Sequence, residues 1–451
     1  MAISLADLGK AVLETEYAVR GPIVARAQEL EKQGREIIYC NIGNPQALEQ
    51  KPLTWVRQIL ALSEYPELAD KAAGVFPADV VQAAEAIHKG SKHGIGAYSE
   101  SKGVRCIREA VAEFITERDG IEADPDSIYL TDGASKGVQA ALRLLLSSPQ
   151  DGIMVPIPQY PLYSATITLY EGKQVNYYLD EHNDWKLSRQ MLEDSLAEAK
   201  RYDVRVKGIV VINPGNPTGS VLDKENIAMI IDFARDHNLT ILADEVYQDN
   251  IYRQGDGFVS FAKVMAEKNE KTVSLFSFHS TSKGYLGECG HRGGYFEIRN
   301  IPADVCAQIL KLQSVSLCSN LPGQVAVYCL VKRPKQGQPS YMQYVAERDG
   351  ILNELKKRAK LLHEGLNRIP GIRCNEVAGA MYAFPSVEVP SGRTDFEYCM
   401  AMLEQTGICV VPGTGFGQIP GTAHFRTTIL PPTAKMEEVI RRIADFHAAY
   451  K

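Results

Sequence analysis

One lysine of the sequence, Lys283, has neighbours that could turn its amine into a nucleophile. It follows the apolar run VSLFSF at residues 273–278, and Ser280 and Ser282 precede it closely. A loop lysine is most often a solvated amine, but a lysine removed from water can lose its proton and attack a carbonyl carbon to form a Schiff base. The two hydroxyls and Arg292 are donors of the kind that an anionic group requires. The stretch therefore predicts carbonyl chemistry beside an anion-binding site.

Two further strand-like runs end in polar residues. The run INPGNPTGS at 212–220 holds Asn216 between two prolines, so that its amide can be aimed at a ligand oxygen from a rigid turn. Asp244 leaves the apolar strand of LADEVYQD, and Tyr247 follows it. Open α/β sheets bind ligands at such strand ends, although an acid there can also simply cap a helix. Asn216, Asp244 and Lys283 are 28 and then 39 residues apart, each after a different strand.

A third motif predicts a site for an anion. Residues 130–146 read LTDGASKGVQAALRLLL, which is a strand, a tight turn and the start of a helix. The free N–H groups and the dipole of a helix N-terminus attract negative charge. The groups concerned belong to Gly133, Ala134, Ser135 and Lys136. The alternative is that Ser135 only caps the helix.

These motifs need a sheet that brings several strand ends together. From about residue 127 onward, short runs rich in Val, Ile, Leu, Tyr and Phe alternate with segments of helical spacing. This alternation predicts an α/β fold whose largely parallel sheet is covered by helices on both faces.

The pattern of predicted strands and helices changes at the polar loop KRPKQGQPS, residues 332–340. After it, a stripe of apolar residues up to Ile369 predicts a long helix stopped by Pro370. Thr394 and Glu397 have the spacing of a helix capping box. The predicted division is a large domain at 66–344 and a smaller α+β domain at 1–65 and 345–451.

Composition excludes several classes of protein. The 451 residues carry a net charge of −6, so there is no electrostatic case for nucleic acid or for an anionic membrane surface. The apolar runs are too short to span a bilayer. Nine scattered cysteines without a CxxC pair indicate reduced thiols and no structural metal. We read no secretory signal at the N-terminus and expect the cytoplasm, or an organelle if a transit peptide was removed.

Taken together, the motifs resemble the fold-type I pyridoxal-phosphate aminotransferases of class I/II over nearly the whole chain. Within that group, the sequence is similar to alanine aminotransferases. The blocks that carry this similarity are NIGNPQ, IGAYSESKGV, VPIPQYPLYSA, VVINPGNPTG, DEVYQDNIY, SKGYLGECGHRGGYFE, GAMYAFP and HFRTTILPP. The resemblance implies an aspartate-aminotransferase-like fold, with a seven-stranded type of sheet in the large domain.

The resemblance also implies a site for pyridoxal 5′-phosphate. Lys283 matches the lysine that holds the cofactor covalently and later moves a proton. Asp244 matches the carboxylate that pairs with the ring nitrogen and keeps it protonated. Tyr247 and Asn216 match donors to the ring hydroxylate, and Tyr160 matches the aromatic side chain that stacks on the ring.

Other positions match the phosphate and substrate contacts of the family. The phosphate group is expected at Ala134, Ser135, Ser280 and Arg292. Tyr98 matches a phosphate contact donated by the neighbouring subunit, which implies a homodimer. Arg292 lies nine residues beyond Lys283 instead of the eight usual in the wider class. The substrate is expected at Gly43, Tyr160, Asn216 and Arg426, where Arg426 would hold its α-carboxylate.

The implied reaction transfers the amino group of L-alanine to 2-oxoglutarate by a ping-pong route, giving pyruvate and L-glutamate. The alternative within the fold is a glutamate:glyoxylate or broader-specificity aminotransferase, or another pyridoxal-phosphate enzyme such as a lyase. A ligand-binding regulator would need a DNA-binding segment, and none is visible before NIGNPQ. A nicotinamide dehydrogenase would need a dinucleotide fingerprint.

Two features imitate other sites. The segment GTGFGQIPG at 413–421 resembles a dinucleotide fingerprint, but Pro420 and Gly421 prevent a helix from opening there, so we expect a loop beside the active site. Cys289 and His291 could suggest a nucleophile or a metal site. Their spacing matches no metal-ligand pattern, so we assign them neither role.

Overall fold

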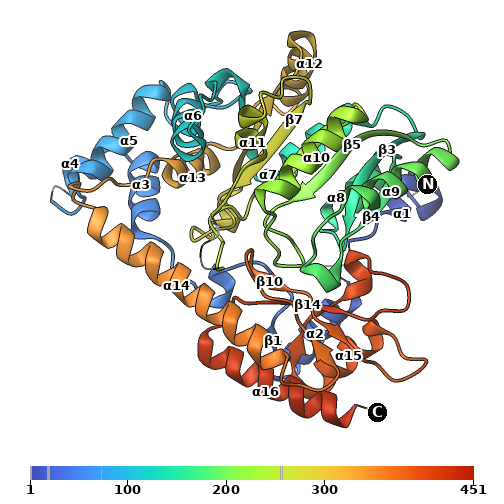
Figure 1. The fold of residues 1–451 in the computed structure, drawn as a ribbon. Helices are drawn as coiled ribbons and strands as arrows, with labels where there is room; N and C mark the ends of the chain where they lie inside the picture. The colour runs from blue at the N-terminus through green and yellow to red at the C-terminus, as the bar shows by residue number, and fades with distance from the viewer. Residues whose placement is uncertain (1–2, 18–20, 73, 254, 256, 451) are drawn as a thin grey trace.

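Seven strands form the main sheet of the protein, whose computed structural model describes residues 3–17, 21–72, 74–253, 255 and 257–450. In chain order they are β2 (Ile128–Asp132), β3 (Asp151–Ile157), β4 (Lys173–Tyr178), β5 (Arg205–Ile212), β6 (Thr240–Asp244), β7 (Leu275–Ser280) and β8 (Gly293–Arg299). Their spatial order is β2-β8-β7-β6-β5-β3-β4. Strands β3 to β7 pair in parallel, and β8 runs antiparallel to β2 and β7. The predicted α/β fold with a mostly parallel sheet is confirmed (Figure 1).

Strand β5 shows why helices cover both faces of this sheet. Ile209 and Val211 belong to one buried cluster, and Val210 and Ile212 belong to another. Successive side chains of a strand point to opposite faces, so an unbroken apolar run is buried on both sides. The first face carries α9 (Arg189–Arg201), α10 (Lys224–Asp236) and α11 (Phe261–Glu267). The second face carries α7 (Ala134–Leu145), α8 (Leu162–Leu169) and α12 (Ala303–Ser314).

A further group of helices packs beside β2 and β8. It comprises α3 (Thr54–Glu64), α4 (Leu68–Lys71), α5 (Ala78–Gly90), α6 (Arg105–Asp119) and α13 (Leu321–Val331). Figure 1 shows this group at one end of the main sheet. Its core includes Trp55, Val56 and Ile59 of α3. Residues of α3 therefore pack with the region around the main sheet.

The remaining elements form a second core below the carboxyl ends of the strands (Figure 1). Its helices are α2 (Pro22–Lys32), α14 (Tyr341–Leu366), α15 (Asp395–Thr406) and α16 (Thr433–Ala449). Its strands are β1 (Ile38–Tyr39), β9 (Ile372–Arg373), β10 (Tyr382–Ala383), β11 (Ser386–Val387), β12 (Ile408–Cys409), β13 (Val411–Pro412) and β14 (Phe425–Thr428). N-terminal and C-terminal segments thus share one core. The domain boundaries themselves stay a prediction, and parts of the predicted small domain at 1–2, 18–20 and 451 lie outside the described residues.

Local sequence signals set the ends of two helices. The long helix predicted after residue 340 is α14, which ends at Leu366, before the predicted stripe does. Asn367 ends it, because its amide donates to the carbonyls of His363 and Cys374 at 2.9 and 2.8 Å and turns the chain. The capping box of α15 is confirmed: Thr394 Oγ1 accepts from the Glu397 N–H at 3.1 Å, and Glu397 accepts from the Thr394 N–H at 2.8 Å.

The remaining short helix is α1 (Lys10–Glu14), which packs near α8. Across the described ranges, no helix combines the length and apolar character needed to cross a membrane.

Candidate active site

The carboxyl ends of β5, β6 and β7 bring three predicted residues together. Ile212 at the end of β5 pairs with Asp244 at the end of β6, and Asp244 pairs with Phe278 of β7. The chain then leaves β5 toward Asn216 and β7 toward Lys283. Parallel strands end at the same edge of a sheet, so residues far apart in sequence converge there.

Asp244 is buried with only half of its carboxylate satisfied. The Tyr163 hydroxyl donates to Oδ2 at 2.8 Å, whereas Oδ1 is buried and has no hydrogen-bond partner among the described residues. Burial raises the pKa of Asp244 from 3.8 to about 6, against the lowering effects of the Tyr163 hydroxyl, the Val246 N–H and the Lys283 amine. An unpaired buried oxygen of this kind indicates a missing cationic or N–H partner.

This pKa predicts how Asp244 affects the stability of the ligand-free protein. Because the pKa of Asp244 is raised from 3.8 to about 6 in the folded protein, its protonation favours folding below pH 3.8. That contribution is lost as the pH rises through about 6. We therefore expect Asp244→Asn to stabilise the ligand-free protein more at about pH 8 than at about pH 4.5, by ~2–3 kcal/mol. Urea unfolding at both pH values measures the difference. Asp445→Asn, in an exposed pair with Arg441, is the control. A larger gain at the lower pH would contradict the prediction.

Lys283 points at a backbone carbonyl. Its Nζ donates to Gly43 O at 3.1 Å and lies 5.6 Å from the centre of the Tyr247 ring. A Cβ on residue 43 would lie 1.7 Å from the Tyr382 hydroxyl oxygen and 3.0 Å from Lys283 Nζ. Residue 43 must therefore be glycine for the backbone to approach the amine and the phenol this closely.

Arg426 is a buried guanidinium without an acidic partner in the described part of the chain. Its side chain lies between two aromatic rings, 4.2 Å from the centre of Tyr382 and 4.6 Å from that of Phe416. Nη2 donates to Asn41 O at 2.6 Å and Nη1 to Asn216 Oδ1 at 3.2 Å, while Nε is buried without a partner. A buried cation is normally paired with an anion. This arrangement therefore favours a carboxylate ligand, which the planar guanidinium group can hold with two parallel hydrogen bonds.

Tyr382 lies close to both cations of the candidate site, Lys283 and Arg426. Its ring packs edge to face with Tyr247, at a centroid distance of 6.2 Å. Burial works to raise the pKa of Tyr382, but the nearby Lys283 and Arg426 hold it below its ordinary value. The two neighbouring cations therefore favour the ionised form of this phenol and make it a better proton donor than an ordinary tyrosine.

The residues of the predicted anion site lie together at the start of α7. Gly133 precedes the helix at φ 76°, and a Cβ there would lie 2.3 Å from Arg292 Nη2. That nitrogen is 3.4 Å from Ser135 Oγ, and Nη1 is 3.5 Å from Ser282 Oγ. The guanidinium also donates to the backbone carbonyls of Asp132 and Cys289. Free helix N–H groups, hydroxyls and a cation without a carboxylate form a site for a phosphate-like group.

Ser280 and Tyr160 lie at opposite sides of this region. The Ser280 hydroxyl accepts from the Ser282 N–H at 3.2 Å and lies 3.2 Å from Gly293 O, to which it donates, so its partners are backbone groups. The Tyr160 hydroxyl is 2.8 Å from that of Tyr17. Burial raises the pKa of Tyr160 well above its ordinary value. Its ring is therefore neutral and suited to stacking.

Tyr98 is the one predicted site residue that this chain leaves apart from the others. Its side chain is 79% exposed. It lies in the connection between α5 and α6, and its assignment to a neighbouring subunit stays a prediction.

The structure adds residues that the sequence analysis did not single out. Tyr163, Tyr382 and Asn41 contact Asp244, Lys283 or Arg426 directly. Tyr163 could have been found one helical turn after Tyr160, and Tyr382 lies inside the quoted block GAMYAFP. Asn41 begins the quoted block NIGNPQ, but its contact with Arg426 is made by its backbone carbonyl, which no residue type would reveal.

Cys289 and His291 received no role from the sequence. The Cys289 thiol lies 3.3 Å from Ser282 O and 3.8 Å from Gly43 O, the carbonyl that Lys283 also contacts. His291 pairs with the buried Glu288 at 2.9 Å. The glycine-rich segment at 413–421 forms the short 3-10 helix η7 (Gly413–Phe416), which the prediction of a loop did not include, and continues as a loop through Pro420 and Gly421.

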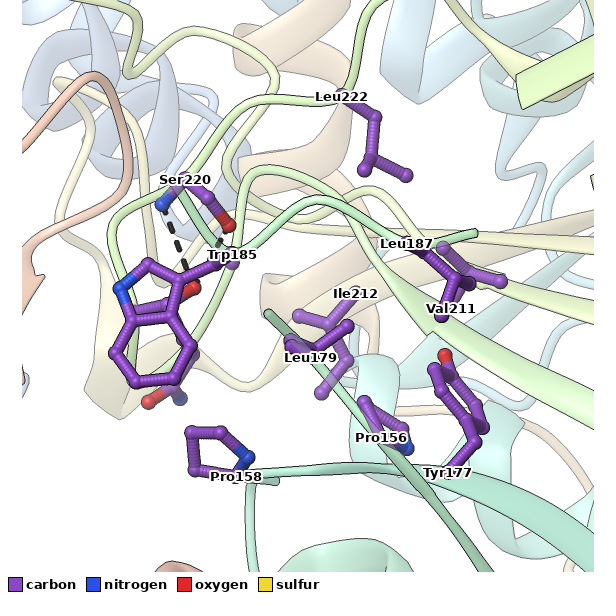
Figure 2. A pocket seen from close by; sticks show the side chains of 13 residues that line it. Pro156, Pro158, Tyr177, Leu179, Trp185, Leu187, Val211, Ile212, Ser220 and Leu222 are labelled. Carbon is purple, nitrogen blue, oxygen red and sulfur yellow. Dashed lines mark hydrogen bonds between the residues drawn. The ribbon is translucent and has the colours of Figure 1, made fainter. Parts of the chain in front are cut away.

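A small cavity lies behind the turn that carries Asn216. Figure 2 shows Pro158, Trp185 and Ile212 among the side chains around it. Its volume is about 20 Å³, enough for a single water molecule. The cavity is too small for a substrate.

Comparisons with known proteins agree with this site. The family described as aminotransferase class I and II matches residues 59–443. A probable mitochondrial alanine aminotransferase of Dictyostelium discoideum is 46% identical, over 100% of this chain and 89% of the relative. Glutamate–glyoxylate aminotransferase 1 of Arabidopsis thaliana is 45% identical, over 99% and 96%. A solved alanine aminotransferase of Pyrococcus furiosus has a TM-score of 0.80 and 28% identity, over 98% of this chain and 100% of that one.

Proposed function

The chain belongs to the class I and II aminotransferases, and from this membership we propose that it transfers the amino group of L-alanine to 2-oxoglutarate, giving pyruvate and L-glutamate. The proposal rests on two side chains that both lie near Tyr382. One is the amine of Lys283, and the other is the buried guanidinium of Arg426, which has no acidic partner among the described residues. One group suits the reacting amine or carbonyl, and the other suits the carboxylate that every amino and oxo acid carries. The relatives named as alanine aminotransferases support alanine as the donor.

The residues present fit pyridoxal 5′-phosphate, the cofactor on which this family depends. Asp244 Oδ1 is buried and unpaired, as a partner for a protonated ring nitrogen should be. The cradle of Gly133, Ser135 and Arg292 would hold the phosphate. When bound, the cofactor supplies a carbonyl carbon for amines and a ring that withdraws electrons from the substrate Cα.

The remaining predicted contacts keep their proposed roles. Tyr247 and Asn216 would donate to the ring hydroxyl, and Tyr160 would stack on the ring. Ala134 and Ser280 would contribute to the phosphate site, Ala134 through its N–H at the start of α7. The Ser280 hydroxyl would have to leave one of its present backbone partners to do so.

We propose that Lys283 moves the proton of the reaction. Its Nζ must first be neutral. It could then take a proton from the substrate Cα and deliver it to the carbonyl-derived carbon of the cofactor. Gly43 O and the Tyr382 phenol hold the amine between them. Arg426 and Asn216 hold the substrate carboxylate, so that its Cα stays within reach of Nζ during the transfer.

The alternative acceptor is glyoxylate. The Arabidopsis relative that is named for glutamate and glyoxylate matches the chain nearly as well as those named for alanine. Both reactions use the same carboxylate contact at Arg426, so that contact does not separate them. The choice depends on the side chains around the rest of the substrate.

A panel of substrates tests the proposal. We expect alanine with 2-oxoglutarate to give the highest kcat/KM, and alanine with glyoxylate or glutamate with glyoxylate to be slower by about tenfold or more. With the cofactor-loaded protein, the assay follows pyruvate formation for the pairs that contain alanine and 2-oxoglutarate formation for glutamate with glyoxylate. Alanine among the slowest donors would overturn the substrate assignment, while no transfer with any pair would overturn the activity.

Assembly and location are proposed with the function. We propose a homodimer in which Tyr98 reaches the phosphate site of the neighbouring subunit, supported by the exposure of its side chain between α5 and α6. We retain the cytoplasm as the proposed compartment. The alternative is the mitochondrion, because curated relatives such as the Dictyostelium protein are named as mitochondrial.

A further inference from the structure

A buried histidine, His424, lies just before the strand that carries Arg426. Its side chain is 3% exposed, and both ring nitrogens have partners. Nε2 lies 3.0 Å from Glu181 Oε2, and Nδ1 lies 2.9 Å from Gln418 Oε1. His424 belongs neither to the phosphate cradle nor to the proton-transfer residues described above.

Both ring nitrogens of His424 face oxygen atoms of neighbouring side chains. The amide of Gln418 is oriented by Asp395, because its Nε2 donates to Asp395 Oδ2 at 3.1 Å. Its oxygen must therefore face Nδ1, and an oxygen can only accept there. The other nitrogen faces a carboxylate, which is also an acceptor. His424 is therefore held from two directions, by Gln418 and by the carboxylate of Glu181.

The same histidine is connected to Arg426 through the strand and through aromatic rings. His424 directly precedes β14 (Phe425–Thr428) and forms an antiparallel bridge with Ser386, so this extended backbone points the side chains of His424 and Arg426, two residues apart, to the same side. The His424 ring stacks on Phe384 at 4.8 Å with an interplanar angle of 6°. Phe384 meets Phe416 edge to face at 5.9 Å, and Phe416 covers Arg426 at 4.6 Å. The His424 carbonyl also accepts from the Gly413 N–H at 2.8 Å, which ties β14 to η7.

Glu181 anchors this group to the main sheet. It lies in η5 (Glu181–Asn183), which follows β4 after Asp180. The side chain of Asn375 donates to Glu181 O at 2.7 Å, and Trp185 lies 6.3 Å from the His424 ring. The Glu181–His424 contact therefore joins the end of β4 to the strand that carries Arg426, across the junction of the two cores.

We propose that His424 is a positioning residue for substrate binding, which holds β14 against Glu181 so that Arg426 meets the substrate carboxylate in the correct place. Arg426 needs such support because no acidic side chain of the described residues pairs with it. Its direct contacts are one carbonyl, one amide oxygen and two ring faces, none of which fixes the plane of the guanidinium as a carboxylate would. The inference rests on the proposed role of Arg426.

The binding of a simple carboxylate tests this role without requiring turnover. Calorimetric titration of the cofactor-loaded protein with propionate gives a dissociation constant that depends on Arg426 and not on the amino group. We expect His424→Gln to weaken propionate binding by about tenfold, since glutamine can donate to one partner only. In the steady state, KM for alanine should rise by a similar factor while kcat changes by less than about threefold.

Glu181 variants test the pair itself. Glu181→Gln should weaken propionate binding in the same direction, and Glu181→Asp, which keeps the charge, should restore most of the loss. In a double-mutant cycle, Glu181→Gln should cause little further loss of propionate binding in a protein that already carries His424→Gln. Glu181 is the more exposed partner, so its variants remain informative if His424→Gln does not fold.

A matched control is available on the surface. His237 and Glu193 form a second His–Glu contact at 3.0 Å, between α9 and the end of α10, remote from Arg426. His237→Gln should leave propionate binding and KM unchanged. Unchanged binding in both His424→Gln and Glu181→Gln would overturn the inference, as would fully additive effects in the cycle.

These outcomes are distinct from failure of the proposed function. Normal alanine transamination together with unaltered propionate binding in the variants would reject the role of His424 and leave the function standing. Weakened propionate binding in a protein that transfers no amino group would reject the function and leave the coupling of His424 to Arg426 standing.

Discussion

Replacement of Lys283 by alanine is expected to lower kcat for alanine and 2-oxoglutarate by about 10⁴-fold or more. The variant loses both the nucleophile for the cofactor carbonyl and the base for the substrate Cα, and general acid–base catalysis alone contributes about 10²–10⁴-fold. In the structure, the other groups around that amine are Gly43 O, the Tyr247 ring and the Tyr382 phenol. None of these can serve as a neutral amine base near neutral pH.

The loss is measured with cofactor-saturated protein, by pyruvate formation over hours and by the visible absorbance of the cofactor. Wild-type protein should show an absorbance that changes in the variant, because the covalent link to Nζ is gone. Lys200→Ala, an exposed lysine near the end of α9, is the control and should keep full activity. A Lys283→Ala protein within about tenfold of wild type would disprove the central role of this residue.

Arg426→Lys is expected to lower kcat/KM for alanine by about 10²–10³-fold, which corresponds to ~3–4 kcal/mol. Lysine keeps the charge but cannot offer two parallel N–H donors to a carboxylate. It would also leave Asn216 Oδ1 or Asn41 O without a donor in a buried place. The stacking between Tyr382 and Phe416 would be weakened as well, because a guanidinium plane suits a ring face better than an ammonium does.

The measurement compares alanine with ethylamine, an amine of similar size that lacks a carboxylate. The ratio of the two kcat/KM values should fall in the variant, because the lost interaction concerns the carboxylate alone. Arg358→Lys is a matched control, since Arg358 is also partly buried and donates to Leu430 O at 2.8 Å, away from Lys283. Equal losses for alanine and ethylamine would show that Arg426 acts on the fold and not on the substrate.

Much of the architecture could be predicted because its signals are local. Apolar runs such as that of β5 alternate with helical spacing, and burial on both faces of a parallel sheet requires that pattern. The capping box at Thr394 and Glu397 is complete within four residues, so its geometry follows from the sequence alone. The end of α14 was less predictable, because Asn367 ends the helix partly through the carbonyl of Cys374, a residue outside it.

The kinds of side chain in the candidate site could also be predicted, because several of these residues follow the end of a strand. Asn216, Asp244 and Lys283 were identified from their position after apolar runs, and the parallel register places them at one edge of the sheet. Arg426 and Arg292 were identified through the blocks that resemble the family. These assignments depend on residue type and order.

The sequence by itself therefore determined the main sheet, the helix caps and the kinds of side chain available for chemistry. Only the tertiary structure decided which partners those side chains have. The Lys283 amine meets a carbonyl 240 residues away, and Arg426 meets one 385 residues away. Such contacts leave no periodic or local pattern in the sequence, because backbone carbonyls are the same at every residue. The same holds for the stretch around Lys283: its residues supply a nucleophile and an anion site, but the approach of Gly43, Tyr382 and Arg426 from the second core creates the place where a substrate can bind between them.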